Sequence, residues 1–425
     1  MNLLLIAPVF PPQRSVASLR THAFATAWAA AGHAVTVLTT KKRDDQTGLS
    51  LPIKGFRLVE LDYSGPRPFE WLRRRSRAAA AGATGTSSSP PSRSARVARW
   101  FKDRTGVFSF VRQPDLTDAW VAPAVAWARA NGPWDVVYSS FGPPAALAVG
   151  VALKARGLVR RWAAEFRDLW LDNDPYGGLF PFTLAERLRE RRALAAADLI
   201  VTVSPGLARR LEQKSGKPVE VVYNGFDPAG LAAISAEPAF PPDGRLRLVH
   251  TGTVYTQRQD PRPLLAGLRA EPRATLVVAG SQSADWTDWG RRHGILPQLD
   301  VRGEVPRAEA LRLQRDASIL VLFGWGTQPN GVLPGKCFEY LKATSPVWVV
   351  GGSPRSSAAE LVVRAGRGVH VPNDPAEIGR RLSEGIERPL ALKADEGFIA
   401  GLNRETQSRR LLERLEELFH REPGA

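Results

Sequence analysis

Short runs of apolar residues alternate along the chain with stretches in which apolar residues recur every three or four positions. The first run, residues 3–7, stops at Pro8, residues 18–31 have helical spacing that ends at Gly32, and residues 34–40 form a second run. Continuous apolar runs are typical of strands buried on both faces of a parallel sheet, and helical spacing predicts a helix that packs on such a sheet. The opening of the chain therefore predicts a β-α-β unit with a right-handed crossover.

The same alternation continues to about residue 228. Pro205 stands where the first turn of a helix tolerates proline, so we expect a helix to begin there. Further strands are predicted at residues 56–61, 135–139, 162–166, 198–203 and 219–223, and further helices at 116–130, 144–156 and 184–197. Residues 1–228 are therefore predicted to form one doubly wound, Rossmann-like domain.

A second alternating region begins after a proline-rich stretch, residues 229–245, that has no periodicity and reads as a linker. Its strands are predicted at residues 247–250, 274–279, 299–302, 319–323, 347–350 and 368–371, and its helices at 261–269, 307–315, 334–343, 358–365 and 375–386. We expect residues 246–402 to form a second Rossmann-like domain and residues 403–425 to form a helix that crosses back to the first. The predicted fold class is α/β, with two doubly wound domains facing a cleft.

The composition agrees with two domains and restricts the cellular compartment that is expected for the protein. A length of 425 residues with 44% hydrophobic residues is enough for two packed cores. The single cysteine, Cys337, cannot form an intramolecular disulfide, so a cytoplasmic location is expected. The first residues lack the basic start of a secretion signal, and no apolar stretch approaches the roughly 18 residues of a spanning helix, so neither feature is expected.

The formal charge of +16 is concentrated in one segment of the predicted first domain. Residues 66–112 carry eleven Lys or Arg against Glu70 and Asp103, interleaved with Trp and Phe, and their middle, residues 78–94, is an Ala/Gly/Ser/Thr/Pro tract that we expect to be mobile. This mixture favours an anionic membrane surface, at the inner membrane face, over a nucleic-acid groove. An acceptor lid and a solvated insert are the alternatives.

Candidate chemistry is sought at the carboxyl ends of the strands, because open α/β sheets bind ligands there. After the first strand, Gln13, Arg14 and Ser15 form a loop that precedes a helix and is predicted to face the acceptor. After the strand at 162–166, Arg167 could meet a phosphate and Asp168 could accept a proton or a hydrogen bond from a sugar hydroxyl. Both are candidate catalytic residues, with an internal ion pair as the alternative.

Two further motifs lie at strand ends of the second domain. In the first, Gly252 would let backbone approach a ligand, and Thr253 and Arg258 follow it toward a helix start where an anion could bind. In the second, Pro334 suits a first helical turn, so nearby amides and the Lys336 ammonium would converge on one anion. The candidate residues of this second motif are Asn330, Gly331, Val332, Leu333, Lys336 and Glu339. No histidine pair has metal-ligand spacing and no nucleophile elbow is present, so no metal site is expected.

Six motifs in order, PPQRS, EFRDLW, ADLIVTVSPGLARRL, VVYNGFDP, HTGTVY and GVLPGKCFEYLKA, resemble the GT-B glycosyltransferases of family 4. The resemblance covers nearly the whole chain except residues 65–112. It implies transfer of a sugar, with retention, from a nucleotide-diphosphate sugar to an acceptor hydroxyl. It also implies that the C-terminal domain holds most of the donor, that the N-terminal domain holds most of the acceptor, and that no cofactor or metal is obligatory.

The resemblance assigns roles to individual residues. Lys336 and Arg258 are implied to neutralise the donor diphosphate, with Lys336 catalytic, and Glu339 corresponds to the second glutamate of the family's Glu-x7-Glu motif, which binds ribose. The first glutamate is replaced by Gly331, and the family's paired glycines in the first loop are absent near residues 15–17. These departures leave two alternatives open, a sugar-nucleotide epimerase of the same architecture and a degenerate, non-catalytic partner subunit.

Overall fold

The computed structural model describes residues 1–43, 46, 48–63, 100, 104–107, 109–172, 176–228, 230, 234–326, 331–387 and 392–421. Most of the basic segment predicted at residues 65–112 lies outside these residues, as does the tract at 78–94. The chain divides into two compact units. The first contains Met1–Val203, Leu207–Val222 and Ser408–Ala425, and the second contains Ser204–Gly206 and Tyr223–Gln407.

Unit 1 is built on a seven-stranded sheet in which the described neighbouring strands are parallel, in the order β3-β2-β1-β4-β5-β6-β7. β1 lies between β2 and β4. From β1 the chain adds β2 and β3 on one side and β4 to β7 on the other, as a doubly wound sheet requires. The strands are β1 (Asn2–Ile6), β2 (Ala34–Thr40), β3 (Arg57–Leu61), β4 (Trp134–Ser140), β5 (Val159–Phe166), β6 (Leu199–Thr202) and β7 (Val219–Val221).

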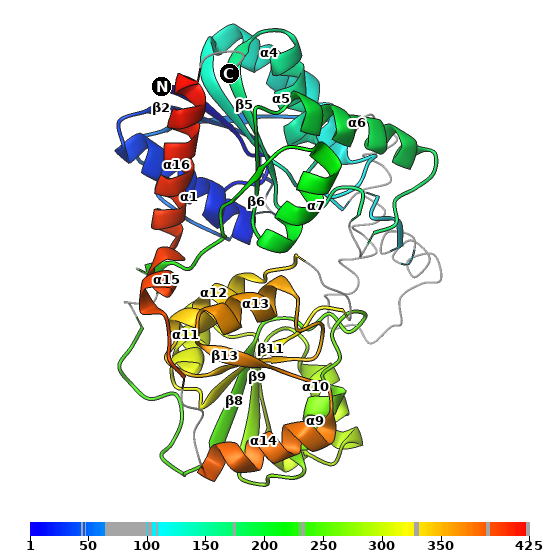
Figure 1. Ribbon diagram of the computed structural model, residues 1–425, viewed down its shortest axis with the longest axis vertical. Coiled ribbons are helices and arrows are strands. Elements are labelled where there is room, and N and C mark those ends of the chain that lie inside the picture. The colour runs from blue at the N-terminus through cyan, green and yellow to red at the C-terminus, as the bar shows by residue number, and fades with distance from the viewer. Residues whose placement is uncertain are drawn as a thin grey trace. The chain divides into compact units, whose positions relative to one another are not determined.

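Helices lie along both faces of this sheet (Figure 1). The first of them starts at a cap, because the Ser15 hydroxyl accepts a hydrogen bond from the Ser18 amide at 3.0 Å. The helical segments are α1 (Val16–Ala30), the 3-10 helix η2 (Leu116–Trp120), α4 (Val121–Asn131), α5 (Ala145–Ala155), α6 (Phe182–Ala196), α7 (Pro205–Ser215) and α16 (Arg404–His420). α16 packs on α1, where the Trp28 indole donates to the Ser408 carbonyl.

Unit 2 repeats the plan with a six-stranded parallel sheet in the order β10-β9-β8-β11-β12-β13. Its strands are β8 (Leu246–Thr251), β9 (Ala274–Ala279), β10 (Leu299–Gly303), β11 (Ile319–Phe323), β12 (Val347–Val350) and β13 (Gly368–Val371). Its helices are α9 (Arg262–Leu268), α10 (Ser283–Arg292), the 3-10 helix η3 (Leu296–Gln298), α11 (Arg307–Arg315), α12 (Gly335–Lys342), α13 (Ser357–Arg364), α14 (Pro375–Glu387) and α15 (Glu396–Gly401). None of the described helices combines the length and apolarity that crossing a bilayer requires.

The predicted fold class, two Rossmann-like α/β domains, is confirmed by these two parallel sheets with interleaved helices. Every predicted strand is present. Among the described residues, three helical segments were not predicted: α10, the 3-10 helix η3 and the short α15. In α10 the apolar contacts come chiefly from Trp286 and Trp289, whose rings pack edge to face at 5.1 Å, and two aromatic residues among polar ones give a weak periodic pattern.

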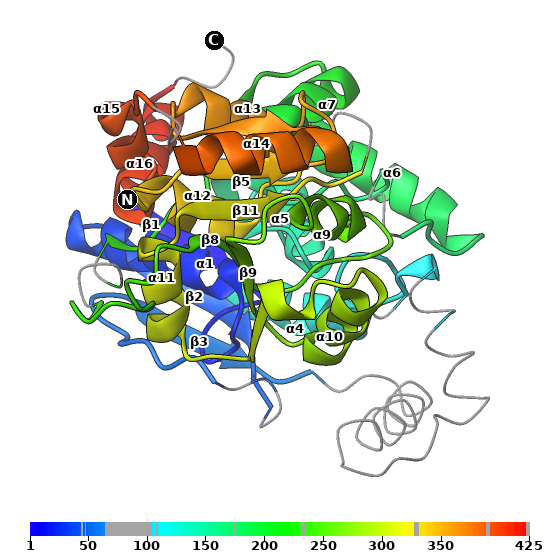
Figure 2. The same cartoon turned by 90° about the horizontal axis from the view of Figure 1, so that it is seen from below.

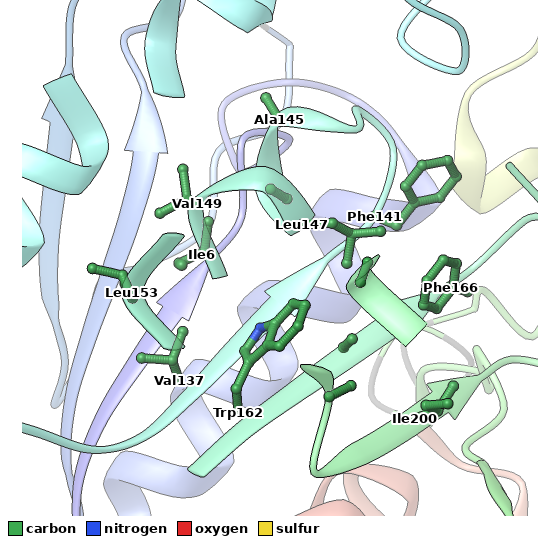
Figure 3. Packing of buried hydrophobic residues seen from close by; sticks show 14 of the residues in the cluster. Ile6, Val137, Phe141, Ala145, Leu147, Val149, Leu153, Trp162, Phe166 and Ile200 are labelled. Carbon is green, nitrogen blue, oxygen red and sulfur yellow. The ribbon is translucent and has the colours of Figure 1, made fainter. Parts of the chain in front are cut away.

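One core of unit 1 lies between the sheet and α5, as Figure 3 shows. Trp162 of β5 is fully buried there near Val149 and Leu153, and its indole N–H donates to the Ser139 hydroxyl at 3.0 Å. Its ring crosses α5 at Gly150, where an added Cβ would lie 2.2 Å from the indole nitrogen. The absence of a side chain at this point of the helix is what lets α5 pack directly on the indole.

Replacing Gly150 with alanine should destabilise unit 1 although alanine is the better helix former. The gain of at most about 1 kcal/mol in helix propensity is outweighed by an overpacking cost of roughly 1–3 kcal/mol, because the added Cβ would lie 2.2 Å from the indole nitrogen and 2.6 Å from the Ser139 hydroxyl. Gly385 of α14 is the control, since no described atom lies within 4 Å of its added Cβ, and Gly385→Ala should leave stability unchanged or raise it. Denaturant unfolding followed by tryptophan fluorescence measures both, and equal effects would contradict this account of the packing.

Candidate functional site

In unit 2, the end of β8 and the start of α12 come together at Gly252 and Lys336. Gly252 follows β8 with a φ of +94°, a left-handed conformation that favours glycine. The Lys336 ammonium lies 3.0 Å from the point that a Cβ on Gly252 would occupy. Two residues predicted separately to meet an anion therefore lie side by side, and a side chain at position 252 would displace the lysine.

Lys336 also contacts His250, one residue before the end of β8. The ring of His250 is buried, its Nδ1 lies 3.0 Å from the Val321 carbonyl oxygen, and its Nε2 lies 3.4 Å from the Lys336 Nζ. Burial, and then the charge of Lys336, hold the pKa of His250 well below its ordinary value. The ring is therefore neutral, with Nδ1 donating to the carbonyl and Nε2 free to accept a hydrogen bond from the ammonium.

The surroundings also shift the lysine itself. Burial lowers the pKa of Lys336 to about 8, and the negative charge of Glu339 opposes part of that shift. At neutral pH the side chain is still mostly a cation. A cation that has lost much of its hydration is attracted strongly to an incoming anion, because little water has to be removed from it when the two meet.

Glu339, one turn further along α12, is held by a network. Its Oε1 accepts from Arg307 at 2.8 Å and its Oε2 lies 3.4 Å from the Gln314 amide nitrogen. The same nitrogen lies 3.0 Å from the Thr251 hydroxyl, and the Thr251 amide donates to the Tyr340 hydroxyl at 2.9 Å. The carboxylate is thus oriented at the end of β8, with lone pairs left for a ligand hydroxyl.

The remaining donor-side candidates lie in loops around this point. Thr253 and Arg258 are exposed, and the turn that carries them is tied to the loop after β11, because the Gly326 amide donates to the Arg258 carbonyl at 2.8 Å. Gly331 is buried and its carbonyl accepts from the Ser204 hydroxyl at 2.7 Å. Of the other three predicted residues, Val332 is half-buried, Leu333 is buried and Asn330 lies outside the described residues.

Two residues of this site, His250 and Arg307, were not predicted from the sequence as binding residues. His250 reads as one polar residue at the end of an apolar strand, and Arg307 is one of many arginines near helix starts. Only the parallel pairing of β8 with β11, and the packing of α11 and α12 beside them, bring the two to Lys336 and Glu339.

In unit 1 the carboxyl ends of β4 and β5 carry a buried charged cluster. Glu165 is fully buried, and its two oxygens accept from the Arg20 guanidinium at 2.7 Å and from the Ser140 hydroxyl at 2.5 Å. Burial alone would raise the pKa of Glu165, but Arg20 and Arg167 together lower it, so the carboxylate stays ionised. This cluster joins α1 to the sheet directly below the strand ends.

Arg167 and Asp168, predicted as catalytic, occupy different surroundings. The Arg167 guanidinium donates to the carbonyls of Phe141 and Gly142, at 2.9 and 3.0 Å, and so anchors the turn after β4. Asp168 is exposed at the end of β5. The structure therefore gives Arg167 a structural task and leaves the Asp168 carboxylate accessible to a ligand.

The predicted acceptor-side loop lies at the start of α1. The Gln13 amide donates to the Phe10 carbonyl at 3.1 Å, Arg14 is exposed, and the Ser15 hydroxyl is occupied as the cap of α1. Elsewhere in unit 1, Asp172 pairs with Lys214 at 2.9 Å. Within the described part of the chain, no three His, Cys, Asp or Glu side chains are grouped so that they could hold a metal ion.

Residues 17–225 match the model of the glycosyl transferase 4-like domain. The chain therefore carries a glycosyl transferase 4-like domain and has the GT-B fold. The family resemblance predicted from the six motifs is confirmed. The sequence matches no curated protein closely enough to count as a relative.

Solved structures share the fold of this chain at low sequence identity. HepE of Anabaena, crystallised in complex with UDP, has 14% identity and a TM-score of 0.63, over 98% of this chain and 100% of its own. Sucrose-phosphate synthase from Thermosynechococcus elongatus has 15% identity and a TM-score of 0.64, over 98% of each chain. A Listeria monocytogenes protein described as a UDP-N-acetylglucosamine 2-epimerase has 11% identity and a TM-score of 0.52, over 99% and 97%.

The neutral state of His250 predicts how stability depends on pH. Because the folded-state pKa of this ring is depressed, the unfolded chain binds a proton below about pH 6.5 that the folded chain does not. Against a His250→Phe variant, the wild-type free energy of unfolding should fall by about 1 kcal/mol between roughly pH 7.5 and 5.5. Denaturant unfolding of both proteins across this range measures the difference, and a constant difference would show that folding does not change the pKa of the ring.

Proposed function

We propose that this glycosyltransferase moves a sugar from a nucleotide-diphosphate sugar to an acceptor hydroxyl, with retention and without an obligatory metal. The observation that carries the proposal is the position of the Lys336 ammonium beside Gly252 and one helical turn from Glu339, at one edge of a Rossmann-like sheet. The complexes of HepE with UDP, and with UDP and glucose, support a nucleotide-linked donor.

On the donor side, Lys336 and the amides of the first turn of α12 meet the diphosphate. The Cys337 amide already donates to the Pro334 carbonyl at 3.0 Å, so the amides of Gly335 and Lys336 are the ones that point where negative charge grows as the bond to the anomeric carbon breaks. Glu339 accepts hydrogen bonds from the ribose hydroxyls, and Arg307 and Gln314 keep its carboxylate in place. Arg258, on its exposed turn, adds a second positive charge toward the diphosphate.

The protein needs no strong base for this reaction. As the leaving diphosphate separates, its oxygen takes the proton of the acceptor hydroxyl, the bond from that hydroxyl oxygen to the anomeric carbon forms, and the nucleoside diphosphate departs. The protein stabilises the charge on the leaving group and orients the two reactants. A preorganised cation does this without reorganisation at the moment of transfer, which is why Lys336 is the residue we place in the catalytic role.

On the acceptor side, the exposed Asp168 carboxylate accepts a hydrogen bond from a second, non-reacting hydroxyl of a sugar acceptor, and Gln13 and Arg14 lie in the acceptor-side loop before α1. Arg167 acts through the turn that it anchors. We place the enzyme in the cytoplasm, at the inner membrane face, with the basic segment 66–112 in contact with anionic lipid. Its charge of eleven basic residues against two acidic ones supports that contact.

An epimerase of the same architecture is the second candidate, and the fold of the Listeria monocytogenes protein favours keeping it. The two activities separate in one experiment. The enzyme is incubated with each common nucleotide sugar without acceptor, and the products are analysed by chromatography. A transferase releases nucleoside diphosphate slowly by hydrolysis, whereas an epimerase returns an isomerised nucleotide sugar.

Removing the Lys336 ammonium should lower turnover without unfolding the protein. In a Lys336→Ala variant we expect kcat to fall about 10²–10³-fold, the effect of losing one preorganised donor to a developing charge. Lys342, at the other end of α12 and exposed, is the matched control, and Lys342→Ala should keep both activity and stability. Steady-state kinetics with thermal unfolding measure these effects, and an unchanged rate in Lys336→Ala would remove this residue from the mechanism.

The lowered pKa of Lys336, about 8, also predicts a pH profile. The positive charge is present below that value and is lost as the pH rises through it, so kcat/KM should decline above about pH 8. In the complex the diphosphate raises the pKa of the lysine, so the decline in kcat should come at higher pH. Lys336→Arg should lose this alkaline decline, because a guanidinium stays charged; a profile shared by the two enzymes would assign the decline to another group.

A further inference from the structure

Over residues 184–190, helix α6 of unit 1 has its polar and apolar sides reversed relative to an ordinary surface helix, whereas its last turn buries Ala193 and Leu194 in the core. Glu186 and Glu190 are only 0% and 3% exposed, whereas Leu184 and Leu188 are 50% and 55% exposed. A surface helix of a globular protein normally turns its apolar stripe toward the core and its charges outward. Here two leucines at i, i+4 spacing form an outward stripe, and two carboxylates at the same spacing point inward.

The inward face is fixed by its polar contacts. Glu186 accepts hydrogen bonds from the Gln113 amide at 2.8 Å and from the Trp170 indole at 3.1 Å, and Glu190 pairs with Lys214 at 3.0 Å. Buried carboxylates with such partners resist exposure, because a turn of the helix would leave the partners unsatisfied. The helix therefore cannot rotate to hide its leucines without breaking this anchoring.

The exposed apolar surface continues beyond the two leucines. Phe180, just before the helix, is 76% exposed, and Phe182, its first residue, is 42% exposed. Exposed arginines flank the stripe along the helix. We call the set the α6 face, and it consists of Phe180, Phe182, Leu184, Arg187, Leu188, Arg191 and Arg192. In both Figure 1 and Figure 2, α6 lies at the margin of its own unit.

Charge decides which partner this face fits. Both carboxylates of α6 are buried and paired, so the charges that the helix presents outward are those of its arginines. A second α6 face would carry the same sign, and so does the basic segment 66–112, so neither complements it. An anionic partner does, and exposed phenylalanine and leucine next to arginine are the composition of helices that lie in a lipid interface.

We propose that the α6 face docks on an anionic lipid surface, with the arginines at the headgroups and the phenylalanine and leucine side chains in the acyl boundary. The contact is separate from the one proposed for residues 66–112 and does not depend on the donor site. The buried ion pairs of Glu186 and Glu190 are the device that holds the apolar stripe outward in the absence of lipid.

The test is co-sedimentation of the full chain with two kinds of vesicle, phosphatidylcholine alone and phosphatidylcholine mixed with phosphatidylglycerol. We expect the wild-type chain to bind the mixed vesicles at low salt and to be weakened by high salt. Arg187→Gln combined with Arg191→Gln and Arg192→Gln should lower the affinity about 100-fold, since each basic residue at the surface is worth ~1 kcal/mol. Phe180→Ser combined with Leu184→Ser and Leu188→Ser should also abolish tight binding, with the salt dependence of residual binding retained.

Matched controls come from unit 2. Arg291 and Arg292 of α10 are 68% and 72% exposed at the side chain, and Val363 of α13 is 56% exposed. Arg291→Gln with Arg292→Gln, and Val363→Ser, remove similar groups from other helices and should leave vesicle binding unchanged. Hydrolysis of the donor without acceptor should be the same in all variants, because none of the changed residues lies in the donor site.

Two results would overturn the proposal. One is a wild-type chain that ignores the mixed vesicles at low salt, which would leave an acidic protein as the partner of the α6 face. The other is full binding by both α6 variants together with loss of binding when Arg73, Arg74, Arg75 and Arg77 are changed to glutamine. That result would assign the membrane contact to the basic segment alone.

Discussion

The function proposed for unit 2 depends on one partly desolvated cation, the ammonium of Lys336. It is held between a strand end without a side chain, at Gly252, and the neutral ring of His250. Burying a charge is costly unless a partner compensates for it, and a neutral acceptor compensates less than a carboxylate would. Burial disfavours the charged form of the lysine and therefore lowers its pKa. The cation is therefore poised to gain from an anion that the protein does not itself supply.

The neighbouring residues keep this charge available. Glu339 could reach toward Lys336, but Arg307 and the Gln314 amide hold its carboxylate. His250 cannot take the role of a second cation, because its own burial and the lysine keep it neutral. The tautomer is fixed by the Val321 carbonyl, which leaves the acceptor nitrogen facing the ammonium. Each contact thus orients the lysine without neutralising it, which is the preorganisation that electrostatic catalysis requires.

The sequence predicts the features of this site that depend on neighbouring residues, but not those that depend on contacts between distant residues. Four strands of unit 2 have the bounds that their apolar runs predict, because a strand buried on both faces has no other pattern: residues 274–279, 319–323, 347–350 and 368–371. Lys336 and Gly252 could be predicted as anion-binding residues because each stands in a local motif at a strand end. The roles of His250 and Arg307 depend on contacts across 86 and 32 residues of sequence, which no local pattern contains.

The orientation of α6 is a second feature that local sequence does not predict. Periodicity predicts the helix but not which face turns inward, and the usual rule would bury Leu184 and Leu188. The rule fails because Glu186 and Glu190 find specific buried partners, and satisfied ion pairs with additional hydrogen bonds can hold a helix as firmly as packing does. In Lys336 and in α6, then, burial of charge is what determines the geometry. In the first case no carboxylate among the described residues contacts the charge directly, and we propose that the charge is kept for a ligand. In the second case the charge is fully paired, and the apolar face is left to meet a partner.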